Sequence, residues 1–159
     1  MTSCPPWIIH CDGSAEPNPG RMGMGAVITA PDGARQTLSL TSSERGCNNE
    51  AELRALMAAL HALDADKVPA LHIYSDNSVL VAQLDGHRLQ PPVARLAGLF
   101  DETRGLLATF DQVMLSWIPR HRNGEADALA RAAIGLPPKV TTKPVQGASA
   151  RLKKRKRSG

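Results

Sequence analysis

The sequence predicts one mixed α/β domain in which three antiparallel strands come first and two further strands return through helices. Two observations predict this class. The first three β-rich runs are separated by turn-forming stretches, and each later run is separated from the one before it by an Ala- and Leu-rich stretch of helical periodicity. The chain of 159 residues is long enough for one such domain with its own core.

The amino-terminal half of the sheet is expected to be a meander of three strands. Residues 7–12 form the first strand, and the turn-rich stretch 13–20 follows it. The second strand covers residues 23–30 and the third covers 35–41. Pro31-Asp32-Gly33 between them is typical of a hairpin turn.

A long helix is predicted from about Asn49 to Leu63, with Asn48 or Asn49 at its N-cap. A short β-rich run at residues 71–75 gives the fourth strand. Residues 78–84 form a short helix, which ends at Asp85-Gly86.

The last third of the chain is predicted to add two helices and the final strand. Pro91 opens a helix that runs to about Thr109, since proline is tolerated in the first turn. Residues 113–118 form the fifth strand, and residues 124–134 the last helix, closed by Gly135.

Composition narrows the class of protein. Apolar residues make up 42% of the chain and aromatic residues 3%, which predicts a globular fold with an aliphatic core. No apolar run approaches the ~20 residues of a membrane span, and residues 1–6 lack the pattern of a signal peptide. Cys4, Cys11 and Cys47 fit neither a disulfide framework nor a zinc site. We therefore expect a cytoplasmic protein.

The net charge of +4 is unevenly distributed. Residues 139–159 hold eight Lys or Arg and no acid, which leaves a balance of −4 for residues 1–138. We expect a folded domain over 1–138 and a basic, disordered tail over 139–159. The tail either holds an anionic polymer such as nucleic acid or is a solubilising or targeting terminus.

Four acids stand at positions where a charge is costly without a partner. Asp12 and Asp76 end strands, at the edge of an α/β sheet where ligands usually bind. Glu52 shares a helical stripe with apolar residues, and Asp127 lies on the apolar side of the last helix.

Each acid also has a structural interpretation. Asp12 and Asp76 could cap turns, and Glu52 could form a cap with Asn48 or Asn49. Together the four favour a hard divalent cation held by oxygen ligands, which suits phosphodiester cleavage assisted by two ions.

With these acids in their motifs, the sequence resembles the type 1 ribonuclease H family, in its compact form without a basic protrusion. The resemblance covers about residues 7–134. The blocks that carry it are Asp12-Gly13-Ser14, Asn18-Pro19-Gly20, Gly23-Met24-Gly25, Asn48-Asn49-Glu50-Ala51-Glu52-Leu53, Tyr74-Ser75-Asp76-Asn77, Trp117-Ile118-Pro119-Arg120-His121 and Asn123-Gly124-Glu125-Ala126-Asp127-Ala128-Leu129-Ala130.

The resemblance implies a five-stranded mixed sheet flanked by helices. It also implies a monomer that hydrolyses the RNA strand of RNA–DNA hybrids to 5′-phosphate and 3′-hydroxyl ends. Two Mg²⁺ ions, for which Mn²⁺ could substitute, would be bound by Asp12, Glu52, Asp76 and Asp127. The minor groove of the hybrid, where the 2′-hydroxyls are exposed, would meet a set of small and amide residues. These are Gly13, Ser14, Asn18, Gly20, Asn48 and Asn49.

Two departures from the family pattern affect substrate handling. His121 falls where one branch has a mobile catalytic histidine, although the loop to Asp127 is shorter here. Larger relatives have a basic, Trp-rich protrusion here that binds the DNA strand. In this sequence the segment 86–106 has only Arg88, Arg95 and Arg104 as basic residues and no Trp, so we expect the basic tail to bind the nucleic acid instead. Two alternatives remain: a nuclease of this fold that prefers double-stranded RNA or junctions, and a non-catalytic nucleic-acid-binding module.

Overall fold

The computed structural model describes residues 5–85 and 94–139. Its sheet has five strands in the order β3-β2-β1-β4-β5, so the predicted mixed α/β class is confirmed. The strands are β1 (Trp7–Glu16), β2 (Gly20–Thr29), β3 (Arg35–Gly46), β4 (Ala70–Ser75) and β5 (Gln112–Trp117). The helices are α1 (Asn48–His61), α2 (Ser78–Leu84), α3 (Ala97–Leu107) and α4 (Gly124–Ala133), with 3-10 turns η1 (Ala65–Lys67), η2 (Ala94–Leu96) and η3 (Arg120–Arg122).

Strand β1 is the centre of the sheet and joins its two halves. It pairs antiparallel with β2 and parallel with β4, and β4 pairs parallel with β5. The carboxyl ends of β4 and β5 therefore meet at one edge of the sheet, beside the carboxyl-terminal half of β1. Asp76 follows β4 at this edge, and Asp12 lies two residues beyond His10, the last β1 residue paired with β4.

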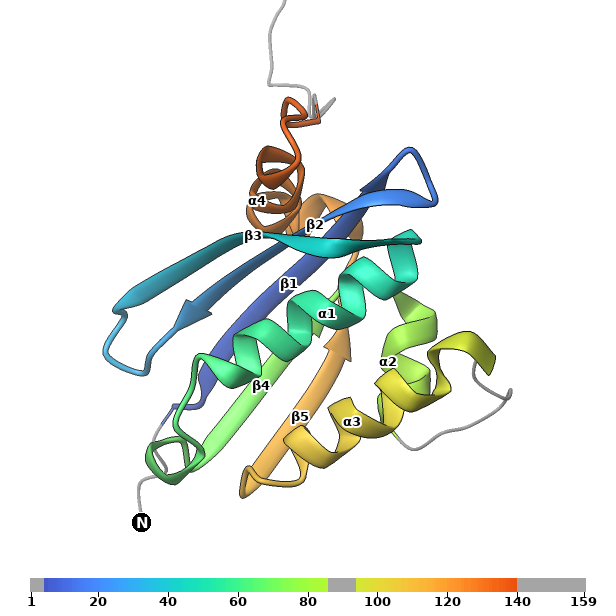
Figure 1. The fold of residues 1–159 in the computed structure, drawn as a ribbon. Coiled ribbons are helices and arrows are strands. Elements are labelled where there is room, and N and C mark those ends of the chain that lie inside the picture. Colours follow the sequence, from blue (N-terminus) through green and yellow to red (C-terminus); the bar gives the residue numbers. More distant parts are fainter. Residues whose placement is uncertain (1–4, 86–93, 140–159) are drawn as a thin grey trace, which may run out of the picture.

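Helices cover the two faces of the sheet unequally. Helices α1, α2 and α3 lie over one face, and α4 packs on the opposite face against β1, β2 and β3 (Figure 1). The main core lies under α1, where Ile9, Leu53, Leu56 and Ile73 are fully buried. Of the helices in the described ranges 5–85 and 94–139, none is long and apolar enough to cross a membrane.

The first hairpin is longer than the sequence predicts. Strand β1 continues to Glu16 and β2 begins at Gly20, so only residues 17–19 form the turn. Ser14 and Ala15 are weak strand formers, but they pair with Gly23 and Met22 across the hairpin. The third strand likewise runs to Gly46 rather than to residue 41.

The predicted N-cap of the long helix is wrong. Cys47 occupies the N-cap position of α1 and makes no side-chain cap bond. Instead, Oδ1 of Asn48 accepts a hydrogen bond of 2.7 Å from the backbone N–H of Ala15. The Asn48 side chain therefore bonds the backbone of β1 instead of capping its own helix.

The helix predicted over residues 91–109 is shorter in the structure. Residues 91–93 lie outside the described ranges, η2 covers Ala94–Leu96, and α3 runs from Ala97 to Leu107. The later elements follow the prediction within one residue at each end.

Helix α4 approaches β2 so closely that glycine is required beneath it. A Cβ at Gly25 would lie less than 3.0 Å from the backbone of Ala126 and Ala130. We expect Gly25→Ala to lower the free energy of unfolding by about 1–3 kcal/mol, because backbone atoms cannot move aside. Urea denaturation measures the effect. The matched control is Gly105→Ala, where a Cβ meets nothing within 4 Å and stability should stay equal or rise. Equal effects of the two changes would contradict the close packing of α4.

Candidate active site

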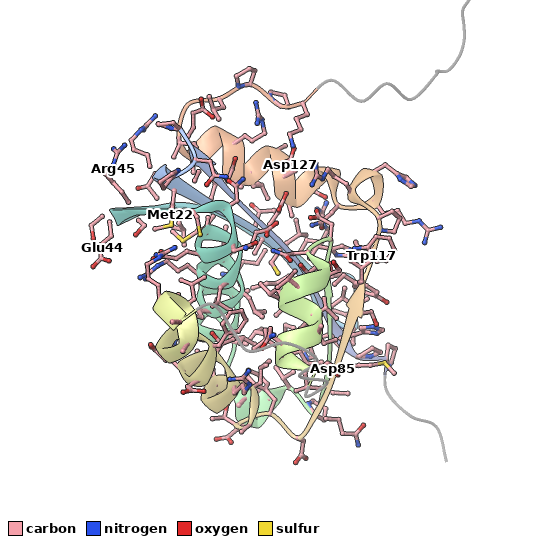
Figure 2. The ribbon with its side chains drawn as sticks, turned by 90° about the vertical axis from the view of Figure 1, so that its right-hand side faces the viewer. Met22, Glu44, Arg45, Asp85, Trp117 and Asp127 are labelled. Carbon is pink, nitrogen blue, oxygen red and sulfur yellow. The ribbon has the colours of Figure 1, made fainter. Side chains whose placement is uncertain are left out.

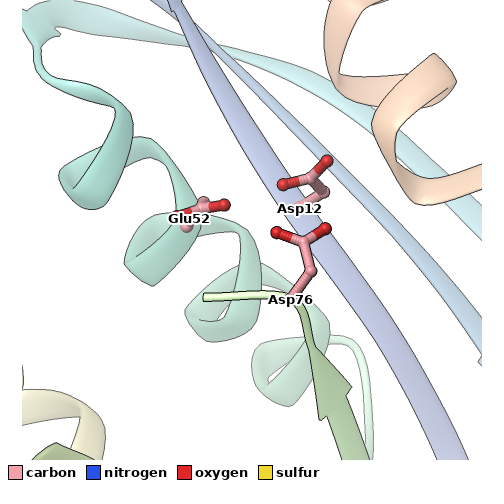
Figure 3. A group of neighbouring side chains, drawn as sticks. All are labelled: Asp12, Glu52 and Asp76. Atoms are coloured by element: carbon pink, nitrogen blue, oxygen red, sulfur yellow. The ribbon is translucent and has the colours of Figure 1, made fainter. Parts of the chain in front are cut away.

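Three carboxylates from separate elements meet at the carboxyl edge of the sheet. Asp12 comes from β1, Glu52 from α1 and Asp76 from the residue after β4, and their ligand oxygens lie within 4.8 Å of one another (Figure 3). Gly13 allows this approach, because a Cβ there would lie less than 3.0 Å from the backbone of Ala51 and Glu52. The arrangement offers a compact set of oxygen ligands, which is what a hard divalent cation requires.

Asp127 reaches the same cavity from the opposite side of the sheet. It lies in the first turn of α4, is 9% exposed, and contributes to a cavity of about 360 Å³. The lining is polar throughout: Asp12, Gly13, Ser14, Asn48, Asn49, Glu52, Asp76, Asn77, Ser78, Arg120, Asp127 and Lys139. All four acids singled out from the sequence therefore line one cavity.

The electrostatics of this cluster favour bound protons or cations. Burial raises the pKa of Asp12 to about 10, helped by a hydrogen bond to Glu52 and by the charges of Asp76, Glu52 and Asp127. Burial also raises the pKa of Glu52. Four acids face only Arg120 and Lys139 among the described residues that line the cavity. The carboxylates are therefore short of positive charge, and divalent cations would supply it.

Two asparagines orient the carboxylates, a role that their positions in the sequence do not predict. The side chain of Asn77 donates to Oε1 of Glu52 and to Oδ1 of Asn49, the latter at 2.8 Å. Asn123 is 1% exposed, and its Nδ2 donates to the Cys11 carbonyl and to Oδ2 of Asp76, both at 2.9 Å. These bonds explain why the motif blocks contain amides beside the acids.

The candidate substrate residues separate into two groups. Gly13, Ser14, Asn48 and Asn49 line the cavity beside the carboxylates. Asn18 lies behind them, and its Oδ1 accepts a hydrogen bond of 3.1 Å from the backbone N–H of Asn48.

Gly20 is buried, and a Cβ there would collide with the backbone of Pro17, so the close approach of the turn to the start of β2 requires glycine. Asn18 and Gly20 thus support the cavity wall, whereas the other four residues form part of it.

The loop after β5 carries Arg120 and His121. In the described part of the chain, Arg120 lines the cavity and His121 does not. Both belong to η3, and His121 is exposed. Trp117 ends β5, is 53% exposed, and donates from Nε1 to the carbonyl of Asp76 at 3.1 Å. Figure 2 shows Trp117 at the end of β5 and Asp127 on α4. The exposed indole therefore lies next to the backbone of Asp76.

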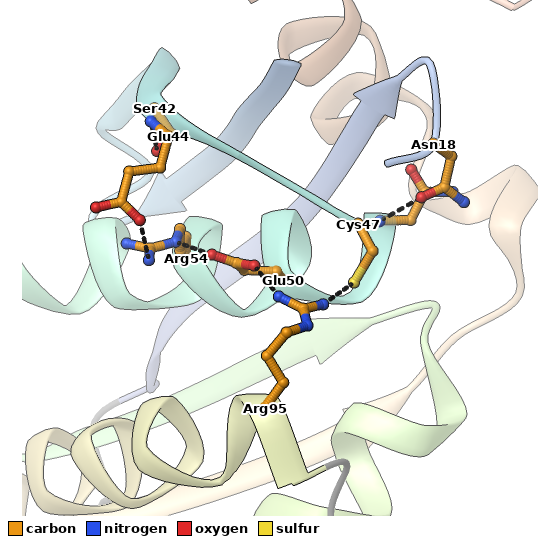
Figure 4. Close-up of polar contacts among 8 residues, drawn as sticks. Asn18, Ser42, Glu44, Cys47, Glu50, Arg54 and Arg95 are labelled. Atoms are coloured by element: carbon orange, nitrogen blue, oxygen red, sulfur yellow. Dashed lines mark hydrogen bonds and ion pairs between the residues drawn. The ribbon is translucent and has the colours of Figure 1, made fainter. Parts of the chain in front are cut away.

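A polar network ties the 3-10 turn η2 to the start of α1 (Figure 4). Glu50 accepts from Arg95 at 2.8 Å and from Arg54 at 2.9 Å, and Arg95 also contacts Sγ of Cys47 at 3.2 Å. Burial raises the pKa of Glu50, but the hydrogen bonds from both arginines outweigh it, so its pKa is lowered.

The bases of the segment 86–106 are therefore largely committed to intramolecular contacts. Arg95 pairs with Glu50, and Arg104 pairs with Asp101 at 2.9 Å. Arg88 lies outside the described residues.

Comparison with known proteins identifies the family. The sequence profile of the reverse transcriptase-like family matches residues 10–133. The crystal structure of RNase H1 from the halophilic archaeon Halobacterium salinarum is 31% identical, with a TM-score of 0.74 over 80% of this chain and 96% of that one. The chain belongs to the type 1 ribonuclease H family.

The chain is also similar to a second solved structure and to a mycobacterial protein. The structure of LC11-RNase H1 in complex with an RNA/DNA hybrid is 30% identical, with a TM-score of 0.71 over 80% of this chain and 96% of that chain. A bifunctional protein of Mycobacterium tuberculosis is 35% identical over 132 residues, which is 80% of this chain. The chain spans only 35% of the length of that mycobacterial relative.

Proposed function

We propose that the protein is an endonuclease that hydrolyses the RNA strand of RNA–DNA hybrids and leaves 5′-phosphate and 3′-hydroxyl ends. The observation that carries the proposal is the cluster of Asp12, Glu52 and Asp76 in one cavity with Asp127. Such a cluster is suited to binding Mg²⁺ ions, and we propose that it binds two. The ions would offset the negative charge of the acids, which would otherwise repel a polyanionic substrate.

The residues present fit divalent cations. All four acids offer oxygen ligands, and burial without basic partners keeps Asp12 protonated until a cation replaces the proton. When bound, the ions supply an activated water and stabilise the leaving oxygen. Asn77 holds Glu52 and Asn123 holds Asp76 in the orientation that the ligand set needs.

The polar wall beside the acids supports recognition of the hybrid's minor groove. Asn48 and Asn49 offer amide groups, and Gly13 and Ser14 offer backbone and hydroxyl groups at the cavity. These groups can bond the 2′-hydroxyls that distinguish RNA from DNA. We further propose that His121, one residue from Arg120, takes part in proton transfer or product release.

A comparison of three substrates tests the proposal. RNA–DNA hybrid, duplex RNA and duplex DNA of one sequence are incubated with the protein and Mg²⁺, and initial rates are compared. The proposal requires the hybrid to be cleaved fastest. Faster cleavage of duplex RNA would favour a different substrate for the same chemistry. Cleavage of none, with retained binding, would point to a non-catalytic module.

We propose that residues 1–138 form the catalytic domain of a cytoplasmic monomer. We also propose that the basic tail, residues 139–159, binds the phosphates of nucleic acid. Residues 140–159 lie outside the described residues. Deleting them removes seven of the eight tail bases. We expect a higher KM, a flatter dependence on salt and little change in kcat, because phosphate contacts release counterions. Initial rates from about 50 to 200 mM KCl measure this. An unchanged KM across that range would contradict a nucleic-acid-binding tail.

A further inference from the structure

Lys139 lies in the wall of the candidate active site, although the sequence places it at the start of the tail. It lines the cavity that holds the four carboxylates, and its Nζ is 4.0 Å from Oδ1 of Asp127. The Lys139 side chain is 48% exposed, whereas that of Asp127 is 12% exposed. The ammonium group therefore reaches the acid from the open side of the cavity.

The segment that leads to Lys139 is anchored to the end of α4. Gly135 has a φ of +78°, which ends the helix and turns the chain. The N–H of Leu136 donates to the Arg131 carbonyl at 2.9 Å, and Nε of Arg131 donates to the Pro137 carbonyl at 2.7 Å. Pro138 restricts the last step before the lysine. The position of Lys139 thus follows from contacts of the folded domain.

The ion pair with Asp127 is too weak to be the main role of this lysine. A pair at 4.0 Å with a half-exposed ammonium group adds little to stability, because solvent screens it. Divalent cations on the carboxylates would also repel the ammonium group. Its flexible four-carbon stem would then let the ammonium group turn away from the carboxylates, toward an anion outside them.

We propose that Lys139 is a substrate-binding residue of this site, and that its ammonium group contacts a backbone phosphate of nucleic acid bound over the carboxylates. The inference rests on the proposed function, since it needs a polyanionic substrate in this cavity. It separates Lys139 from the rest of the tail: this lysine belongs to the folded active site.

The test compares Lys139→Gln with Lys67→Gln, which removes the same charge from η1, before the amino end of β4. KM and kcat for hybrid cleavage are measured from about 50 to 200 mM KCl. We expect Lys139→Gln to raise KM about five- to tenfold near 100 mM salt and to reduce the slope of log KM against log salt by about 0.9. Lys139→Arg should restore the slope, and Lys67→Gln should leave it unchanged.

A second readout uses the protein without nucleic acid. The melting temperature of each variant is measured against Mg²⁺ concentration. Tighter Mg²⁺ binding by Lys139→Gln with an unchanged salt slope would overturn the inference and leave Lys139 as a counter-ion of Asp127. A wild-type protein that leaves hybrids intact would refute the proposed function instead. The salt slope of the dissociation constant for the hybrid, measured by binding without turnover, then decides the role of Lys139 separately.

Discussion

Asp76→Asn is expected to lower kcat for hybrid cleavage by about a thousandfold or more, which corresponds to about 4 kcal/mol of transition-state stabilisation. Asp76 stands within the cluster of ligand oxygens, and Asn123 fixes one of its oxygens by a hydrogen bond of 2.9 Å. The asparagine keeps the size and the polar contact but lacks the negative charge. KM should change much less than kcat, because the loss concerns the chemical step.

The matched control for this prediction is Asp66→Asn in η1, before the amino end of β4. It removes one exposed carboxylate at a distance from the cavity, so kcat should stay within about twofold of the wild type. Melting curves of both variants guard against unfolding as a cause. A folded Asp76→Asn protein with wild-type kcat would refute the assignment of this acid to the metal site.

Asp12→Asn is expected to make the metal-free protein more stable at neutral and alkaline pH. The folded wild type keeps a raised pKa at Asp12, chiefly through burial, whereas the unfolded chain ionises near its ordinary value of 3.8. Between these values the folded state binds more protons, so wild-type stability falls as pH rises. Asparagine removes this loss. We expect a gain of about 1–3 kcal/mol at pH 8, which shrinks toward pH 4.

Thermal or urea unfolding in EDTA at pH 4, 6 and 8 measures this gain. Adding Mg²⁺ should stabilise the wild type and stabilise Asp12→Asn much less, because the ion replaces the proton at the carboxylate. A variant less stable than the wild type at pH 8 without metal would show that Asp12 is satisfied in the folded protein. Burial next to other acids would then be wrong as the explanation of its raised pKa.

The four acids could be located from the sequence because their positions follow from local rules. Asp12 and Asp76 stand at or after predicted strands, and Glu52 keeps a fixed place on the apolar stripe of a long helix. Parallel pairing of β1 with β4 then brings the first two together. The class of the sheet could be predicted from the order of strands and helices, which also follows from local patterns.

Long-range contacts account for what sequence reasoning missed. Asn123 bonds a carbonyl 112 residues away, and no local pattern predicts that partner. Ser14 and Ala15 join β1 only because β2 pairs with them. The charge pattern places Lys139 in the tail, but the turn after α4 directs it to the cavity. Tertiary contacts that local sequence patterns do not reveal determine each of these positions.

The most direct test of the central claim follows both strands of one RNA–DNA hybrid. Each strand carries its own 5′ label, and wild-type protein is added with Mg²⁺ or with EDTA. We predict that Mg²⁺ leads to internal cleavage of the RNA strand alone, with 3′-hydroxyl ends that a polymerase can extend, and that EDTA abolishes it. Cleavage of the DNA strand, or equal RNA cleavage in EDTA, would contradict a metal-dependent ribonuclease H built on these carboxylates.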